Sequence, residues 1–146
     1  MKFTCSIDIN KPRETVVALF EDPQYLGEYQ DGFISKELES GESMQTGAVA
    51  IMRYKQGKGQ MKLTETIIKN ELPDVFVGHY HHTHMDNTMT CRFETLSNNQ
   101  TRYTSEIHYT AFRGFLPRIL ARLFPSMFKK QVQKWLTNFK HFAEKQ

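Results

Sequence analysis

The most unusual local pattern in the chain is a run of histidines between residues 79 and 84. His79, His81, His82 and His84 form two His-x-His pairs. Alternate residues of a strand share a face, so each pair offers two nitrogen ligands of the kind that zinc prefers. The same alternation divides the four histidines between two faces, so they cannot form one cluster. A third ligand could come only from Glu65 or Cys91 inside, or from His108 or Glu94 outside, and spacing without a completed ligand set is weak evidence for a site. We therefore expect no metal site and no cofactor, and histidines that are solvated outside and hydrogen-bonded inside.

Acid–base chemistry is the second kind of reaction that the side chains permit. Glu65 alternates with Leu63 and Ile67 on one expected strand, and His82 alternates with Tyr80 on a later one. An inward-facing carboxylate beside a histidine can act as a general acid or base near neutral pH. The alternative is that these groups satisfy one another or anchor a ligand. The sequence has no Ser-His-Asp arrangement, nucleophile elbow or phosphate loop.

The two cysteines point to a structural role. Cys5 and Cys91 lie far apart in the sequence and show no Cys-x-x-Cys spacing, which excludes a disulfide scaffold. Cys91 is expected to be a small buried hydrophobic residue, since no motif nearby would activate its thiol. The first ten residues lack the apolar core of a secretory signal, and no run of about 18 apolar residues occurs. We therefore predict a cytoplasmic protein with reduced thiols.

The elements that must position these residues follow from hydrophobic periodicity. Period-2 alternation opens the chain, and two short helices follow it, the second starting at Asp22-Pro23. From residue 115 the apolar residues recur at three and four, which predicts one long amphipathic helix that Pro125 breaks or kinks near Phe124. Turn residues separate the expected strands. These strands span residues 2–9, 33–40, 47–56, 59–70, 75–85, 88–97 and 101–111.

Charge is distributed unevenly along the chain. The 146 residues carry a net charge of +3, but the segment from Arg113 to Gln146 contains eight Lys or Arg against one acid, while the remainder contains eleven against fifteen. Lys129, Lys130 and Lys134 form a basic patch, and Phe115 and Leu116, with Phe128, are candidate apolar anchors for a membrane. The favoured interpretation is instead a solvated outer face of the helix that contacts neither nucleic acid nor a membrane.

The hairpins fix which side chains face inward. If Asp86 and Asn87 form a two-residue turn, His82 lies opposite Cys91. A three-residue loop at 98–100 then places Arg92 beside Glu106 and Cys91 beside Ile107. The apolar face of these strands, together with the long helix, is expected to line a ligand pocket. The candidate lining residues are Glu65, Tyr80, His82, His84, Met89, Cys91, Phe93, Tyr103, Ser105, Ile107, Tyr109, Phe124, Met127, Phe128 and Trp135.

One long helix across a curved antiparallel sheet leaves a cavity, because the sheet twist and the helix cylinder do not match along their length. At this level the chain resembles the START-like helix-grip superfamily (SRPBCC), and within it the polyketide cyclase/dehydrase-like branch of small bacterial proteins. The marks are the opening Phe3–Ile9 strand with Lys11-Pro12, the Asp22-Pro23…Tyr29 helix, Leu72-Pro73, and Phe139 to Glu144 at the end. The resemblance implies an α+β helix-grip fold with about seven strands, one domain over residues 1–146.

Fold membership leaves the activity open, since this superfamily holds carriers, receptors, enzymes and co-chaperones. The leading hypothesis is binding of a small hydrophobic or aromatic molecule, including a lipid, with polar anchoring by Glu65, Tyr80 and His82. The segment from Gly114 to Pro125 would then form the lid or mouth. The alternatives are a cyclase or hydratase using Glu65 and His82 as its acid–base pair, and a partner-binding module with an exposed apolar patch. The protein is expected to be a monomer or a homodimer.

Overall fold

The protein is described by a computed structural model that covers residues 1–146. Seven antiparallel strands form one sheet in the order β1-β7-β6-β5-β4-β3-β2. The strands are β1 (Lys2–Ile9), β2 (Phe33–Ser40), β3 (Val49–Gln56), β4 (Gly59–Glu71), β5 (Val75–His81), β6 (Met85–Ser97) and β7 (Gln100–Phe112). The helices are α1 (Arg13–Glu21), the 3-10 turn η1 (Pro23–Tyr25), α2 (Leu26–Tyr29), α3 (Phe115–Leu123) and α4 (Pro125–Glu144). The expected order of elements is confirmed.

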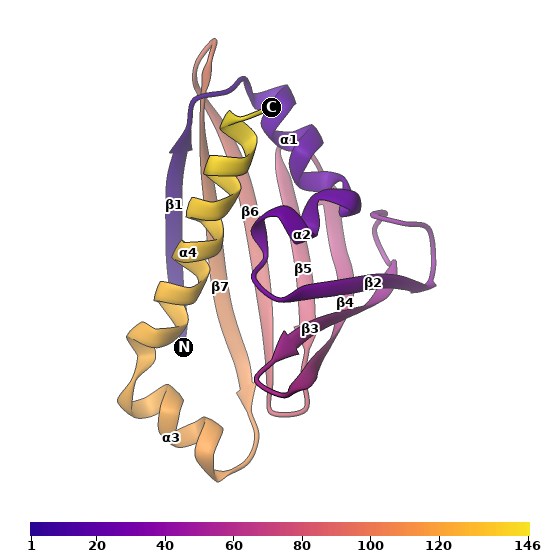
Figure 1. The fold of residues 1–146 in the computed structure, drawn as a ribbon, viewed down its shortest axis with the longest axis vertical. Coiled ribbons are helices and arrows are strands. Elements are labelled where there is room, and N and C mark those ends of the chain that lie inside the picture. The colour runs from indigo at the N-terminus through magenta and orange to yellow at the C-terminus, as the bar shows by residue number, and fades with distance from the viewer.

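The sheet curves around α4, the long C-terminal helix. Figure 1 shows α4 running beside β1 and β7, with α1 and α2 over one end of the sheet and β2 and β3 crossing in front. At the other end, α3 turns away from the axis of α4. No helix is long and apolar enough to cross a membrane.

The hydrophobic core lies at the end that α1 and α2 cover. Phe20 of α1 packs its ring against Phe76, Phe93 and Tyr103 of the sheet, with centroid distances of 5.5, 5.0 and 5.8 Å. Phe139 of α4, 1% exposed, meets the same ring at 6.4 Å. Edge-to-face aromatic packing of this kind fixes the helices on the sheet.

The turn between β5 and β6 lies three residues earlier than the sequence indicates. The backbone groups of His82 and Met85 bond to each other, so Thr83 and His84 form the turn and β5 ends at His81. Phe76 therefore lies opposite Cys91, where His82 was expected. The expected turn at Asp86-Asn87 is wrong because Asp86 is held within β6, where a bulge follows it.

The turn between β6 and β7 also differs from the expectation. Ser97 pairs with Gln100, which makes a two-residue turn. A bulge next to Thr95 then returns the side chains of β7 to the faces expected from the sequence. Arg92 therefore lies opposite Thr104 instead of beside Glu106. The bulge supplies the extra residue that a three-residue loop was expected to supply.

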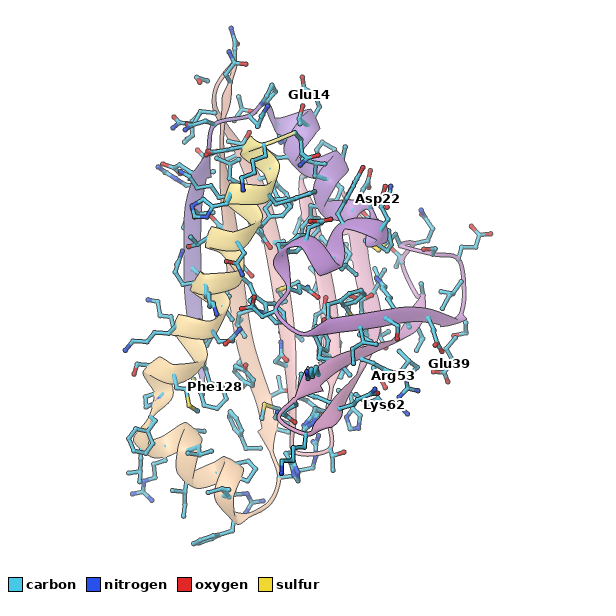
Figure 2. All side chains as sticks on the ribbon, viewed as in Figure 1. Glu14, Asp22, Glu39, Arg53, Lys62 and Phe128 are labelled. Carbon is cyan, nitrogen blue, oxygen red and sulfur yellow. The ribbon has the colours of Figure 1, made fainter.

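The expected long helix is two helices with different surroundings. Pro125 begins α4 and Phe124 separates it from α3, as the sequence indicates. Leu136, Phe139 and Ala143 of α4 are buried, whereas α3 has no buried residue. Figure 2 shows Phe128 near the start of α4, close to where α3 ends.

Candidate ligand-binding cavity

A cavity of about 290 Å³ lies between the sheet and α4. Of its 29 lining residues 19 are hydrophobic. Five of the seven methionines in the chain are among them: Met44, Met52, Met61, Met85 and Met89. Methionine side chains are flexible and polarizable, so they adapt to ligands of different outline. The volume is near the small end of the range typical of ligand pockets.

The polar centre of the cavity wall is the buried carboxylate of Glu65. Glu65 is 4% exposed, and the Tyr80 hydroxyl donates to its Oε2 at 2.8 Å. Lys36 Nζ lies 2.8 Å from Oε1, which neutralises the buried charge, but Oε1 receives no aligned hydrogen bond. A buried charge needs such a partner. Oε1 therefore carries the Lys36 ion pair and keeps a lone pair at the wall of an otherwise apolar space.

Tyr80 remains a neutral donor at any physiological pH. Burial, and then the charge of Glu65, raise the pKa of Tyr80 well above its ordinary value. Its position depends on a glycine two residues earlier in β5. A Cβ on Gly78 would lie 2.7 Å from the Tyr80 hydroxyl oxygen and 2.9 Å from a ring carbon. Gly78 therefore leaves the space in which the Tyr80 ring lies on its way to Glu65.

Trp135 supplies an unused hydrogen-bond donor. Its indole ring lines the cavity from α4 and stacks on Tyr54 of β3 at 5.7 Å. The Tyr54 hydroxyl is engaged, since it donates to Gln30 at 2.7 Å. The Trp135 Nε1 is buried and has no acceptor. Such donors are rare in native structures, so this N–H is a candidate contact for an acceptor on a bound molecule.

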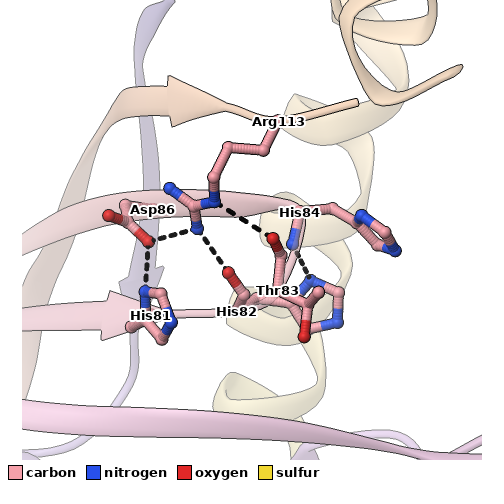
Figure 3. A network of polar contacts seen from close by, with 6 residues as sticks. All are labelled: His81, His82, Thr83, His84, Asp86 and Arg113. Atoms are coloured by element: carbon pink, nitrogen blue, oxygen red, sulfur yellow. Dashed lines mark hydrogen bonds and ion pairs between the residues drawn. The ribbon is translucent and has the colours of Figure 1, made fainter. Parts of the chain in front are cut away.

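A polar network secures the β5–β6 turn, which borders the cavity (Figure 3). Arg113, just after β7, donates to the backbone carbonyls of His82 and Thr83 and to Asp86 Oδ1 at 2.8 Å. His81 Nδ1 lies 2.7 Å from the same Asp86 oxygen. The Arg113 hydrogen bond holds the pKa of Asp86 below its usual range. The network ties the end of β7 to the turn.

His82 points to the cavity from this turn. Its Nδ1 accepts a hydrogen bond from the backbone N–H of His84 at 3.1 Å. Burial, followed by the nearby His84, His81 and Arg113, lowers the pKa of His82, so the ring is neutral at physiological pH. No hydrogen bond joins His82 to Glu65, whose partners are Tyr80 and Lys36. The expected acid–base pair is therefore not assembled in this structure.

The structure places nine of the fifteen candidate residues at the cavity. These are Glu65, Tyr80, His82, Met89, Tyr103, Ser105, Ile107, Tyr109 and Trp135. Their contact with a ligand stays a prediction. No group of three or more His, Cys, Asp or Glu side chains lies close enough together to hold a metal ion.

Six candidates lie outside the cavity wall, which corrects the expected lining. His84 is an exposed turn residue, while Cys91 and Phe93 are buried in the core toward α1. Burial raises the pKa of the Cys91 thiol to about 11, which makes it a poor nucleophile. The remaining three precede or begin α4. Phe124 and Met127 are 56% and 47% exposed, and Phe128 packs outside against Tyr109 and Phe112.

Two important residues of the site were missed by sequence reasoning. Gly78 carries a readable signal, because an isolated glycine inside a strand marks a close approach. Lys36 carries none, since β2 is an edge strand with bulges at both ends and no clear alternation of polar and apolar residues. Its contact with Glu65 depends on the curvature that brings β2 over β4.

Comparisons with known proteins address the fold. No protein-family model and no curated protein matches the chain. Among solved structures, Zhui aromatase/cyclase from Streptomyces sp. R1128 superposes with a TM-score of 0.81 at 11% identity, over 99% of this chain and 93% of that one. TTHA0849 from Thermus thermophilus superposes with a TM-score of 0.77 at 14% identity, over 98% of this chain and 97% of that one.

A plant protein has the same architecture. Major latex-like protein 151 from Panax ginseng superposes with a TM-score of 0.74 at 14% identity, over 98% of this chain and 97% of that one. The coverage extends over both chains in each comparison, while the identities are too low to transfer a function. The chain therefore has the α+β helix-grip fold of these proteins, which is the fold that the resemblance of its sequence implies.

Proposed function

We propose that this protein binds one small, mostly apolar molecule that carries an oxygen acceptor. The observation that carries the proposal is the unpartnered Trp135 Nε1 at the wall of an apolar cavity of about 290 Å³. A buried N–H without an acceptor costs about 1–3 kcal/mol. A carbonyl, ether or hydroxyl oxygen of a bound molecule removes that cost.

The second anchor is Glu65. Its Oε1 has ionic contact with Lys36 but no aligned hydrogen bond, so a hydroxyl or N–H group of the ligand can donate to it. The two anchors together favour a molecule with an acceptor at one point and a donor at another, on an apolar frame. The methionine-rich wall favours binding of several related molecules of different shape over binding of one molecule of fixed shape. The aromatase/cyclase with the same fold supports a ring-bearing member of that class.

Mass spectrometry of the purified protein tests this proposal. Denaturing extraction is expected to release an apolar small molecule from the wild type. Val132→Phe enlarges a side chain of α4 that lines the cavity, so its extract is expected to contain less than about a tenth as much. Val77→Phe is the matched control, because Val77 alternates with Phe76 and Gly78 and lies on the other face of β5. Equal recovery from all three proteins would overturn the proposal.

A second function is acid–base catalysis of the cyclase or hydratase type, which one observation favours. Glu65 presents a buried carboxylate to the cavity with the Tyr80 hydroxyl 2.8 Å away, so a proton relay would involve Tyr80 instead of His82. Glu65→Gln keeps the shape of the site and removes the base. Incubating the recovered molecule with wild type and with Glu65→Gln would reveal a mass change or isomerisation with wild type alone. Equal losses of binding and turnover would contradict catalysis by Glu65.

The cellular setting and assembly stay predictions. Both cysteines are free and buried, which is consistent with the predicted cytoplasmic location. Monomer and homodimer both remain compatible with a cavity that a single chain builds. The one-domain organisation over residues 1–146 is supported by a core that joins residues of the sheet, α1, α2 and α4.

A further inference from the structure

The helix α3 exposes an apolar surface that nothing in the protein covers. Phe115, Leu116 and Leu123 are 82%, 63% and 63% exposed, and Phe124 and Met127 continue the surface into the start of α4. We call these five side chains the α3 apolar surface. The sequence of α3 is strongly amphipathic, yet none of its nine residues is buried. Its apolar face therefore lacks the partner that such faces normally have.

The charges next to this surface all have one sign. Residues 113–130 contain five basic side chains and no acidic one. Arg113 is engaged by Asp86, but Arg118, Arg122, Lys129 and Lys130 have no acidic partner within 4 Å. All four are exposed. An uncovered apolar surface is thus bordered by four unpaired cations.

We propose that α3 and the first turn of α4 dock on the surface of an anionic lipid bilayer. Apolar side chains of an amphipathic helix insert at the boundary between headgroups and acyl chains, while cations beside them attract anionic headgroups. Both features occur here within one short segment.

The charge pattern disfavours a second copy of the chain as the occupant. A two-fold contact through the α3 apolar surface would bring eight unpaired cations together without one acidic side chain from this segment. Like charges at an interface core are unfavourable, whereas an anionic bilayer supplies the missing counter-charge.

Docking in this way would bring the part of the cavity wall beside the β5–β6 turn close to lipid. Arg113 ties the start of the α3 segment to the β5–β6 turn, whose neighbours Met85 and Asn87 line the cavity. Gln131 lines it one turn after Met127. Exchange of ligand with the bilayer rests on the proposed function, but docking itself does not depend on any ligand.

Flotation with vesicles tests the apolar part of the proposal. Wild-type protein is expected to float with vesicles of equimolar phosphatidylcholine and phosphatidylglycerol. The double variant Phe115→Ser, Leu116→Ser is expected to bind at least about tenfold more weakly, because it removes two inserted side chains. Ile34→Ser, Leu38→Ser is the matched control, since both are exposed apolar residues, at 46% and 50%, on edge strand β2. The control is expected to bind like wild type.

Charge variants test the electrostatic part. Arg122→Gln, Lys130→Gln is expected to lower the partition coefficient about tenfold or more on the same vesicles, at about 1 kcal/mol per cation near a charged surface. Arg92→Gln, Lys145→Gln makes the same change in net charge at exposed positions outside the segment. Wild-type binding is also expected to weaken when salt rises from about 0.1 to about 1 M. Thermal unfolding checks that every variant is folded.

Three results would overturn the proposal. One is wild-type protein that floats with neither anionic nor pure phosphatidylcholine vesicles. Another is binding that Phe115→Ser, Leu116→Ser leaves unchanged. The third is a concentration-dependent dimer that the same double variant abolishes, since a second copy or another protein surface would then cover α3. None of these results depends on ligand recovery, so failure here is distinguishable from failure of the proposed function.

Discussion

The helices α3 and α4 come from one continuous amphipathic pattern, yet they have opposite surroundings. Leu136, Phe139 and Ala143 of α4 are buried, and Phe139 packs against Phe20 of α1 and Tyr29 of α2. Phe115, Leu116 and Leu123 of α3 are exposed to solvent. Gly114, with a φ of 88°, and Phe124 separate α3 from both neighbours. A hydrophobic period indicates that a face will be covered; it does not identify what covers it.

Two phenylalanines give the largest test of this contrast. Phe139→Ala removes a ring that packs against Phe20, Tyr29 and Tyr103, and is expected to lower the free energy of unfolding by about 3–5 kcal/mol. Phe115→Ala makes the same chemical change at an 82% exposed position and should alter the free energy of unfolding by less than about 0.5 kcal/mol. Urea unfolding measures both. A large loss for Phe115→Ala would mean that α3 packs on the protein.

The second-largest expected effect on stability comes from the buried ion pair on the cavity wall. Lys36→Met leaves the Glu65 carboxylate buried without its cation, and is expected to cost about 3 kcal/mol of stability. Combining it with Glu65→Gln removes the unpaired charge and should restore most of that loss. A four-protein unfolding cycle measures the coupling. If the two losses simply add, the ion pair does not support the site as described.

A glycine variant tests how the closed wall positions Tyr80. Gly78→Ala places a Cβ where the Tyr80 ring lies, so the ring must move and the bond to Glu65 is expected to break. The expected cost is about 1–3 kcal/mol of unfolding free energy. Gly59→Ala is the matched control in a strand end, because the nearest atom to its added Cβ would be 3.9 Å away. Indistinguishable stabilities would show that the Tyr80 ring moves freely.

The smallest expected effect is the pH dependence of stability at the Asp86–Arg113 contact beside the β5–β6 turn. Arg113 lowers the pKa of Asp86 from a reference of 3.8, so this contact stabilises the fold above that value and the contribution is lost as the pH falls through the lower folded-state value. Partial exposure limits the effect to about 1 kcal/mol or less. The free energies of unfolding of wild type and Asp86→Asn, measured at pH about 5 and about 3, should differ more from each other at the higher pH. A constant difference would contradict the role of the Asp86 charge.

Much of the fold was predictable because strand errors of an even number of residues leave the faces unchanged. The partner of Cys91 on β5 is Phe76 where His82 was expected, a displacement of six residues. The partner of Cys91 on β7 is Ser105 instead of Ile107, a displacement of two. Both are even, so Tyr80, Met89 and Tyr109 still face the cavity. Faces are specified by alternation, whereas register depends on turns and bulges.

The rest of the site depends on contacts that local patterns do not encode. Asp86-Asn87 has the composition of a turn, but Arg113, 27 residues later, binds Asp86 and keeps it within β6. Lys36 meets Glu65 across the curvature of the sheet. The exposure of Phe124 and Met127 follows from the direction in which α3 leaves β7. Each depends on partners distant in sequence.

The fluorescence of Trp135 tests the central claim most directly, since it is the only tryptophan and it lines the cavity. Titration with the neutral apolar dye Nile red, which carries a carbonyl oxygen, is expected to quench Trp135 saturably, with one dye bound per chain. Val132→Phe should abolish the quenching, and Val77→Phe should preserve it. Quenching that is absent, fails to saturate, or persists in Val132→Phe would contradict a ligand site in this cavity.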